Sequence, residues 1–364
     1  MEARPVLLFG RFREEDLGRL SHAAEQAACV PRHVESIEEA LAWLEEYNEA
    51  QGLLCNLDES EQLVVQTRSL ARFSRLPVLA IAEPLGDLAF VSAFSWGADD
   101  VLPLAPERPL VTRLRALPKQ APPLPQDGRG AALVAEADRT RRAAVARVLR
   151  NAGFSVRFAV SPEDAEQFAR DPSLSLVVAG TELVREPSAT IRAARSEGSD
   201  ARFILCCPPR ALKQERAQLG DLSGVTATDG FASPENVLFV ANELLMGART
   251  NGRTSPRVAY GTLVAFRGAG REVDERGFTY NVSANGIYVR TLALPEDDEV
   301  WLELCPPAMD RRVRLVGRVA WRRPFGYSET ATVPPGFGVQ IVDGAQRDLA
   351  LWKEGYEQLL ATVG

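Results

Sequence analysis

RPVLLFG (residues 4–10) and GAALVAE (residues 130–136) are continuously apolar segments that begin two similar patterns far apart in the chain. Each is followed by helical periodicity and then by further apolar runs, of which LPVLAIAE (76–83) and ARFILCC (201–207) form a matching pair. Strands that are apolar throughout and alternate with helices are typical of a parallel sheet covered on both faces. The first two thirds of the chain therefore predict two copies of a flavodoxin-like, doubly wound α/β unit.

The helices between these runs begin in the same way in both copies. VESIEEALAWL (34–44) and AVSPEDAEQFA (159–169) each place a serine directly before a first turn that contains acids. A serine hydroxyl at this position accepts a backbone hydrogen bond, and the acids face the positive end of the helix dipole. GLLCNLD (52–58) and SLVVAGT (175–181) then supply the next buried strand of each copy.

The composition is that of an ordinary globular chain. Of 364 residues, 46% are hydrophobic and 25% are charged, and this length corresponds to two or three domains. Lys and Arg number 42 and Asp and Glu number 49, which gives a formal net charge of −7. This balance disfavours nucleic-acid binding over a broad surface, so any anionic ligand must be held by a local cluster of cations.

The N-terminal segment lacks the long apolar core and cleavage site of a signal peptide, and no stretch is apolar for the length that a bilayer needs. We therefore expect a cytoplasmic protein without a membrane span. The five cysteines and two histidines show no metal-ligand spacing. Buried thiols are expected, and zinc sites and histidine-based triads are disfavoured.

Two polar segments divide the chain. PKQAPPLPQDGRG (118–130) reads as a Pro-rich, semi-stiff linker, and GARTNGRTSP (247–256) reads as a second joint. The predicted domains are a first α/β unit, a second α/β unit and a C-terminal domain, at residues 1–117, 131–246 and 247–364.

From about residue 257 the apolar pattern changes to an alternation with a period of two. Short strands separated by turn residues, among them RVAYGTLVAFRG (257–268) and VRLVGRVAWRR (313–323), predict an antiparallel β-barrel. The chain closes with a helical pattern whose apolar stripe most simply caps an open end of the barrel. The stripe consists of Leu349, Trp352, Tyr356 and Leu359.

Two short motifs in the C-terminal domain indicate a ligand site. Asn281 and Ser283, in NVSANG (281–286), are two apart on one strand and project to the same face. Asn285 and Gly286 tolerate the positive φ values that a tight hairpin needs. RTSPRVAYG (253–261) places Arg253 and Arg257 on a segment that Pro256 keeps from being helical at the preceding residue, so both can reach the same rim.

The guanidinium fork suits phosphate oxygens and the O6/N7 edge of guanine, and it also stacks on a purine face. A ligand that offers both guanines and phosphates would use all of these features. Either motif alone is weak evidence, because a solvated turn and an Asn-Gly hairpin explain it equally well. Their combination in one domain is much more specific.

The two α/β units resemble the receiver domains of response regulators. In the first unit, PVLAIAE (77–83) and SAFSWGADDVLPLAPERPL (92–110) are similar to the fourth and fifth strands of that family. In the second unit, ADRTRRAAVARVLRNAGFSVRFAVSPEDA (137–165) is similar to the first helix and second strand. The resemblance implies a Mg²⁺-binding acidic pair, an aspartate that accepts a phosphoryl group, and a nearby Thr or Ser and Lys.

This chain departs from that pattern at nearly every one of these positions. In the first unit, Phe9-Gly10-Arg11 replaces the acidic pair, and Asn56 stands at the acceptor position, with Asp58 two residues later. The Thr position holds Ala82 and the Lys position holds Leu104. In the second unit Glu136 and Asp138 remain acidic, which leaves metal binding open, but Gly180 and Cys206 occupy the acceptor and Thr positions. An amide or a glycine cannot form an acyl phosphate, so both units are expected to act as docking surfaces.

The R-x-x-x-R of Arg253 and Arg257, followed by the N-x-S-x-x-G of Asn281, Ser283 and Gly286, resembles the PilZ domain. The resemblance covers roughly residues 250–364 and implies a receptor for cyclic di-GMP. It implies that the arginines clamp guanine edges and phosphates, that Asn281 and Ser283 hydrogen-bond the guanine, and that Gly286 permits close backbone approach. Many members of the family have Gly where this chain has Asn285.

The sequence thus predicts a non-enzymatic cyclic di-GMP effector in which ligand capture orders the 247–256 joint and reorients the α/β units toward a protein partner. The family context implies control of motility or polysaccharide output, and a homo-oligomer is an open possibility. The alternatives are an interaction adaptor with a ligand-silent PilZ barrel and, less favoured, a phosphorylation-driven regulator. An enzyme is disfavoured, because no catalytic constellation is evident and the Glu136–Asp138 pair reads as a surface remnant.

Overall fold

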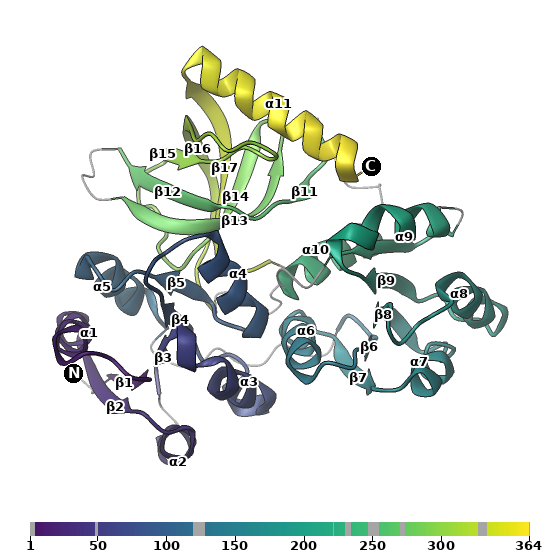
Figure 1. Ribbon diagram of the computed structural model, residues 1–364, viewed down its shortest axis with the longest axis horizontal. Coiled ribbons are helices and arrows are strands. Elements are labelled where there is room, and N and C mark those ends of the chain that lie inside the picture. Colours follow the sequence, from purple (N-terminus) through teal and green to yellow (C-terminus); the bar gives the residue numbers. More distant parts are fainter. Residues whose placement is uncertain are drawn as a thin grey trace.

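The computed structural model describes residues 4–47, 50–118, 128–220, 222–229, 234–246, 255–269, 274–326 and 333–363. Across these ranges the chain forms two parallel α/β sheets and one antiparallel barrel (Figure 1). Most of the 118–130 linker, the joint up to residue 254 and Arg253 lie outside the described residues. Among the helices that are described, none is both long and apolar enough to cross a membrane.

The first unit is a five-stranded parallel sheet in the order β2-β1-β3-β4-β5. Helices α1 and α5 pack on one face, and α2, α3 and α4 pack on the other. Its strands are β1 (Arg4–Phe9), β2 (Cys29–Val34), β3 (Gly52–Asn56), β4 (Val78–Ile81) and β5 (Asp100–Leu102). Its helices are α1 (Glu14–Gln26), α2 (Ile37–Glu46), α3 (Glu61–Ser69), α4 (Asp87–Trp96) and α5 (Glu107–Ala116).

The second unit repeats this topology, with the strand order β7-β6-β8-β9-β10. Its strands are β6 (Ala131–Ala135), β7 (Ser155–Ala159), β8 (Leu174–Gly180), β9 (Arg202–Cys206) and β10 (Val225–Thr228). Its helices are α6 (Arg139–Asn151), α7 (Pro162–Phe168), α8 (Pro187–Ser196), α9 (Leu212–Leu219) and α10 (Pro234–Met246). The predicted tandem of doubly wound units is confirmed. Ser36 and Ser161 also cap α2 and α7, since each hydroxyl accepts a backbone N–H at 3.1 Å.

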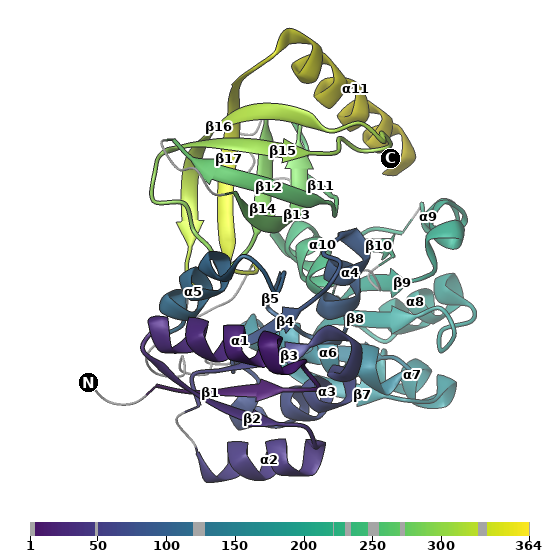
Figure 2. The same cartoon turned by 60° about the vertical axis from the view of Figure 1, so that its left-hand side comes forward.

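The C-terminal domain is an antiparallel barrel that the β13–β14 pairing closes, and α11 follows it. Its elements are β11 (Val258–Ala259), β12 (Leu263–Gly268), β13 (Glu275–Ser283), β14 (Gly286–Arg290), β15 (Glu299–Leu304), β16 (Val313–Arg323), β17 (Gly336–Gly344) and α11 (Gln346–Val363). The barrel stands on α4 and α5 of the first unit, and the second unit lies beside both (Figures 1 and 2).

One predicted barrel strand is interrupted. RVAYGTLVAFRG, which the alternation suggests as a single run, forms β11 and β12 with a break at Tyr260–Thr262. A Cβ at Gly261 would lie only 2.6 Å from the Phe278 ring, so the chain bends where that ring lies against the backbone. Alternation alone does not reveal such a contact, because Phe278 comes from the next strand.

Candidate functional site

A hollow of about 290 Å³ opens at one end of the barrel, and it is called the rim hollow below. It lies where the segment before β11, the β13–β14 hairpin, β16 and β17 meet. Its lining includes four of the five residues predicted for the ligand site, namely Arg257, Asn281, Ser283 and Gly286. The fifth, Arg253, lies outside the described residues. The structure therefore brings together every predicted site residue that it describes.

Strand register explains why these residues meet. In the β13–β14 hairpin, Ser283 lies opposite Gly286 and Asn281 lies opposite Tyr288. On the other edge of β13, Val258 lies opposite Val282, so Arg257 enters β11 beside the end of the hairpin. Asn281 is buried, whereas Ser283 and Arg257 are half-buried.

The reason given from the sequence for the hairpin glycine is wrong. The loop is Ala284–Asn285, and neither these residues nor Gly286 have a positive φ. What Gly286 provides is space: a Cβ there would lie 3.1 Å from the Ser283 Oγ and 3.3 Å from the Val339 carbonyl oxygen. The glycine therefore keeps the backbone open to close approach at the edge of the hollow.

An aromatic floor completes the rim hollow, and the sequence motifs did not indicate it. Trp321 on β16 stacks on Tyr288 of β14, with ring centroids 4.8 Å apart and an interplanar angle of 19°. Both rings line the hollow, together with Gly338. A Cβ at Gly338 would lie 2.4 Å from the Trp321 Nε1, so only glycine lets the indole lie over β17. The one available signal was the tryptophan in the VAWRR run.

Helix α11 fastens both edges of the site. The Trp352 indole N–H donates to the Ala284 carbonyl in the hairpin loop at 3.0 Å. One turn later, the Tyr356 hydroxyl donates to the Pro256 carbonyl, directly before Arg257, at 2.7 Å. The predicted apolar stripe is confirmed as core, since Trp352 and Tyr356 are 2% and 3% exposed within the barrel cluster.

The electrostatics of the rim hollow favour an anionic, planar ligand. Among the described residues that line it, Arg257 alone carries a formal charge, and none is acidic. Amide and hydroxyl groups supply donors and acceptors, and the Tyr288–Trp321 pair supplies a flat apolar surface. Burial raises the pKa of the Tyr288 phenol, whose hydroxyl donates to the Pro334 carbonyl, so this ring stays neutral and offers the hollow its flat face. The described residues that line the hollow include no carboxylate, histidine or cysteine, and their donors and acceptors suit binding and orienting a ligand.

The first α/β unit keeps a hollow of about 590 Å³ at the carboxyl edge of its sheet, with altered chemistry. Asn56 ends β3, and its amide donates to the Arg11 carbonyl at 2.9 Å. Ala82 and Leu104 line the same hollow and are both buried. These side chains place an amide and methyl groups where receivers hold the phosphate acceptor and its partners.

In the second α/β unit an arginine occupies the corresponding place. Glu136 accepts hydrogen bonds from the Asp138 backbone N–H at 2.8 Å and from the Arg141 guanidinium at 2.9 Å. Arg141 also donates to Glu182 at 2.7 Å. Asp138 serves as the N-cap of α6. The expectation of a surface remnant is wrong for Glu136, which is 5% exposed and whose pKa is raised by burial.

These features define a class of protein: a barrel with a polar and aromatic hollow at one end, joined to two doubly wound α/β units. Residues 251–356 match the family model of the PilZ domain. The C-terminal barrel is a PilZ domain, and PilZ domains are a family of cyclic di-GMP receptors.

Solved structures show distant likenesses to parts of the chain. The Bacillus subtilis inhibitor of motility (MotI/DgrA) is 20% identical over 30% of this chain and 53% of its own, with a TM-score of 0.24. A CheY-like protein (TadZ) from Pseudomonas aeruginosa is 23% identical over 32% of this chain and 94% of its own, with a TM-score of 0.26. A response regulator in red light signalling of R. palustris is 19% identical over 31% and 90%, with a TM-score of 0.26.

This chain spans about half the length of the Bacillus subtilis motility inhibitor that it matches, at 53%. No curated protein is similar enough to this chain to count as a match.

Proposed function

We propose that this protein is a non-enzymatic, cytoplasmic effector that binds cyclic di-GMP in the rim hollow of its PilZ domain. Arg257, together with Arg253, holds guanine edges and phosphates, while Asn281 and Ser283 hydrogen-bond a guanine. Capture of the ligand orders the 247–256 joint and changes how the two receiver-like units present themselves to a protein partner. The output is control of motility or of a surface polysaccharide.

One observation carries this proposal. Arg257, Asn281, Ser283 and Gly286 come from three separate segments and line one hollow, in a domain that matches the PilZ family. The hollow adds an aromatic floor that suits a purine face, and its described lining contains no acid that would repel phosphate.

An affinity near the micromolar range sets what the contacts must supply. Ordering about six residues of the joint costs roughly 1–2 kcal/mol each. Charge-assisted hydrogen bonds contribute about 1.5–3 kcal/mol each, and purine stacking contributes a further 1–3 kcal/mol. A net binding free energy near −8 kcal/mol, which corresponds to about 1 μM, therefore requires both arginines and the aromatic floor to act together.

The first prediction tests the site with a matched pair of arginine variants. We expect Arg257→Ala to weaken cyclic di-GMP binding by about 100-fold, because two charge-assisted hydrogen bonds are lost. Arg311→Ala removes an exposed arginine from the segment before β16, outside the rim hollow, and should leave the affinity unchanged. Titration calorimetry of the wild type and both variants measures this, with circular dichroism as the check on folding.

If Arg257→Ala binds cyclic di-GMP as tightly as the wild type, the rim hollow is not the binding site. A wild type that binds no cyclic di-GMP would leave the alternative function, an interaction adaptor with a ligand-silent barrel. The receiver-like units fit either outcome, since neither has the groups needed for phosphorylation at the receiver position.

A further inference from the structure

The barrel and the first unit share their apolar cores. Phe278 of β13 belongs to the same buried cluster as Phe90 and Phe94 of α4. It stacks on Phe90 at 5.2 Å and meets Phe94 edge-on at 5.9 Å. On the other face of the first sheet, Leu292 of the barrel is buried in the cluster formed with α1 and α5. These two parts are therefore joined by the kind of contact that makes a single packed body.

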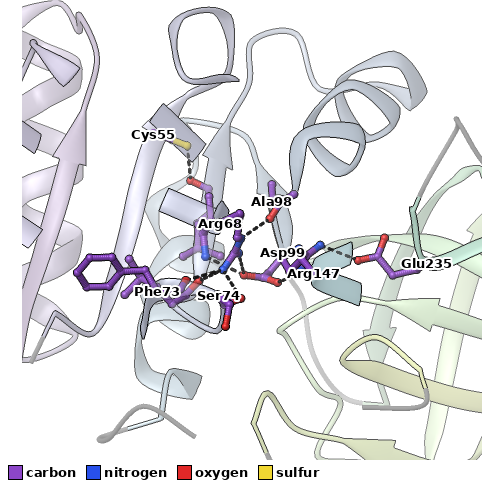
Figure 3. A network of polar contacts seen from close by, with 12 residues as sticks. Cys55, Arg68, Phe73, Ser74, Ala98, Asp99, Arg147 and Glu235 are labelled. Carbon is purple, nitrogen blue, oxygen red and sulfur yellow. Dashed lines mark hydrogen bonds and ion pairs between the residues drawn. The ribbon is translucent and has the colours of Figure 1, made fainter. Parts of the chain in front are cut away.

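The second unit is attached differently. Over the described residues, both of its buried apolar clusters consist of its own side chains alone. Its helix α6 packs against α3 and α4 of the first unit. At the common junction of all three parts, an alternating chain of charged groups crosses the interface. The chain runs through Arg68, Asp99, Arg147 and Glu235, which Figure 3 labels. It ends at Arg290 of the barrel.

The contacts along this chain cross all three parts. Arg68 donates to Asp99 at 2.6 Å within the first unit, and Arg147 of the second unit lies 3.8 Å from the other Asp99 oxygen. Glu235 accepts from Arg147 at 3.0 Å and from Arg290 of the barrel at 2.9 Å. Arg290 closes the circuit by donating to the Ala98 carbonyl of the first unit at 2.8 Å.

These charged side chains are buried, and their burial determines how much the ion pairs stabilise the junction. Each of the five residues is at most 5% exposed. Burial lowers the pKa of Arg68 to about 10, so it stays charged at neutral pH. Buried ion pairs specify one arrangement more than they stabilise it, because desolvation offsets most of the attraction. An interface of this kind fixes a geometry and still opens more easily than a shared apolar core does.

Glu235 is the point where the second unit meets the barrel. It lies in the first turn of α10, and its backbone carbonyl accepts a hydrogen bond from the Tyr280 hydroxyl at 2.7 Å. One turn later, Phe239 meets the Tyr280 ring edge-on at 5.9 Å. The other end of α10 leads along the chain into the 247–256 joint, which contains Arg253 and ends directly before Arg257.

The rim hollow is connected to Glu235 by two further routes. Strand β14 begins at Gly286, on the hollow, and ends at Arg290, about 13 Å away at 3.3 Å per residue. In parallel, Trp321 stacks on Tyr288, and Tyr288 meets Tyr280 edge-on at 5.7 Å. Tyr280 then holds the Glu235 carbonyl, so both routes end on the same residue.

We propose that the first unit and the barrel move as one body, and that the second unit is the part that ligand binding repositions. In this arrangement the Glu235 carboxylate, held between Arg147 and Arg290, is the latch. The inference rests on the proposed function for the identity of the ligand. It assigns the conformational response to one unit and to one junction.

The second prediction tests the latch with matched Glu→Gln variants of the full chain. Glu235→Gln weakens both buried ion pairs, whereas Glu45→Gln weakens an exposed one with Arg72. Small-angle scattering without ligand should show a larger radius of gyration for Glu235→Gln than for Glu45→Gln and wild type. The Kd for cyclic di-GMP should change about fivefold or more in Glu235→Gln alone. Unchanged scattering overturns the latch, and a released second unit with unchanged affinity overturns the coupling.

Hydrogen exchange on the wild-type chain keeps the inference testable if Glu235→Gln does not fold. Saturating cyclic di-GMP should alter amide exchange in the first turn of α10, in α6 around Arg147 and at residues 97–100, all remote from the rim hollow. Changes confined to the rim hollow and the joint would overturn the inference while leaving the proposed ligand site intact. If the wild type does not bind the ligand, the proposed function fails, and the scattering comparison still judges the latch.

Discussion

At the scale of single residues, the glycines of the site act through the space that they leave. Gly338 of β17 pairs with Tyr288 of β14. A Cβ at Gly338 would lie 2.4 Å from the Trp321 Nε1, so the absence of this atom makes room for the indole. The indole then stacks on Tyr288 and forms the floor of the rim hollow. Sequence reasoning associates such a glycine with a turn, because a close approach depends on a residue that is distant in the chain.

The third prediction concerns this contact. Gly338→Ala should displace Trp321 from its stack, destabilise the barrel by about 1–3 kcal/mol through overpacking, and weaken cyclic di-GMP binding. Gly18→Ala is the matched control, since nothing lies within 4 Å of a Cβ there and the residue is exposed on α1. That change should stabilise the protein by about 0.5–1 kcal/mol. Urea unfolding followed by tryptophan fluorescence measures both, and equal stabilities would contradict the packing argument.

At the scale of elements, α11 turns a strand hairpin and an incoming segment into a site of fixed shape. Its indole and phenol donors bind the carbonyls of Ala284 and Pro256 on the two sides of the rim hollow. The apolar period predicts that this face of α11 is buried. The same pattern does not show where the Trp352 indole N–H and the Tyr356 hydroxyl donate, because their acceptors lie far away in the sequence.

The fourth prediction separates the donor from the apolar ring. Trp352→Phe keeps an aromatic side chain on α11 but removes the N–H that holds the hairpin loop. We expect cyclic di-GMP affinity to fall roughly 2- to 10-fold, the equivalent of one net hydrogen bond. Trp43→Phe is the control, because it makes the same change on α2, which packs on the sheet of the first unit and not on the barrel. Calorimetry that shows equal affinities for the two variants would exclude a role for α11 in shaping the site.

Local patterns predicted most of the elements, and long-range contacts account for what they did not predict. The buried strands of both units, the serine caps of α2 and α7 and the N-x-S spacing on β13 all follow from short windows of sequence. The break at Gly261 and the pairing of Arg141 with Glu182 depend on side chains brought in by folding. The aromatic floor belongs with these, because its rings come from two strands.

At the scale of the whole molecule, composition and linkers suggest three separate domains, yet the cores divide the chain differently. Phe278 and Leu292 of the barrel are buried with the first unit, whereas the apolar clusters described for the second unit contain only its own residues. The reason is that α4 carries Phe90 and Phe94 one turn apart on the same face, and both rings contact Phe278 of β13. A helix as apolar as α4 gives no sign in its sequence of which partner each side meets.

The fifth prediction asks whether this division holds in solution. Phe278→Ala should cost about 3–5 kcal/mol and should raise amide exchange in α4 as well as in the barrel, because the ring is part of both cores. Phe154→Ala removes an equally buried ring from the second unit, where it packs only against that unit's residues. Its effect should stay within the second unit and leave α4 unchanged. Exchange in α4 that responds equally to both variants would mean that all three parts unfold together. If amide exchange in α4 does not change in Phe278→Ala, the barrel and the first unit do not form one body. The Glu235 latch would then have no rigid body to hold the second unit against.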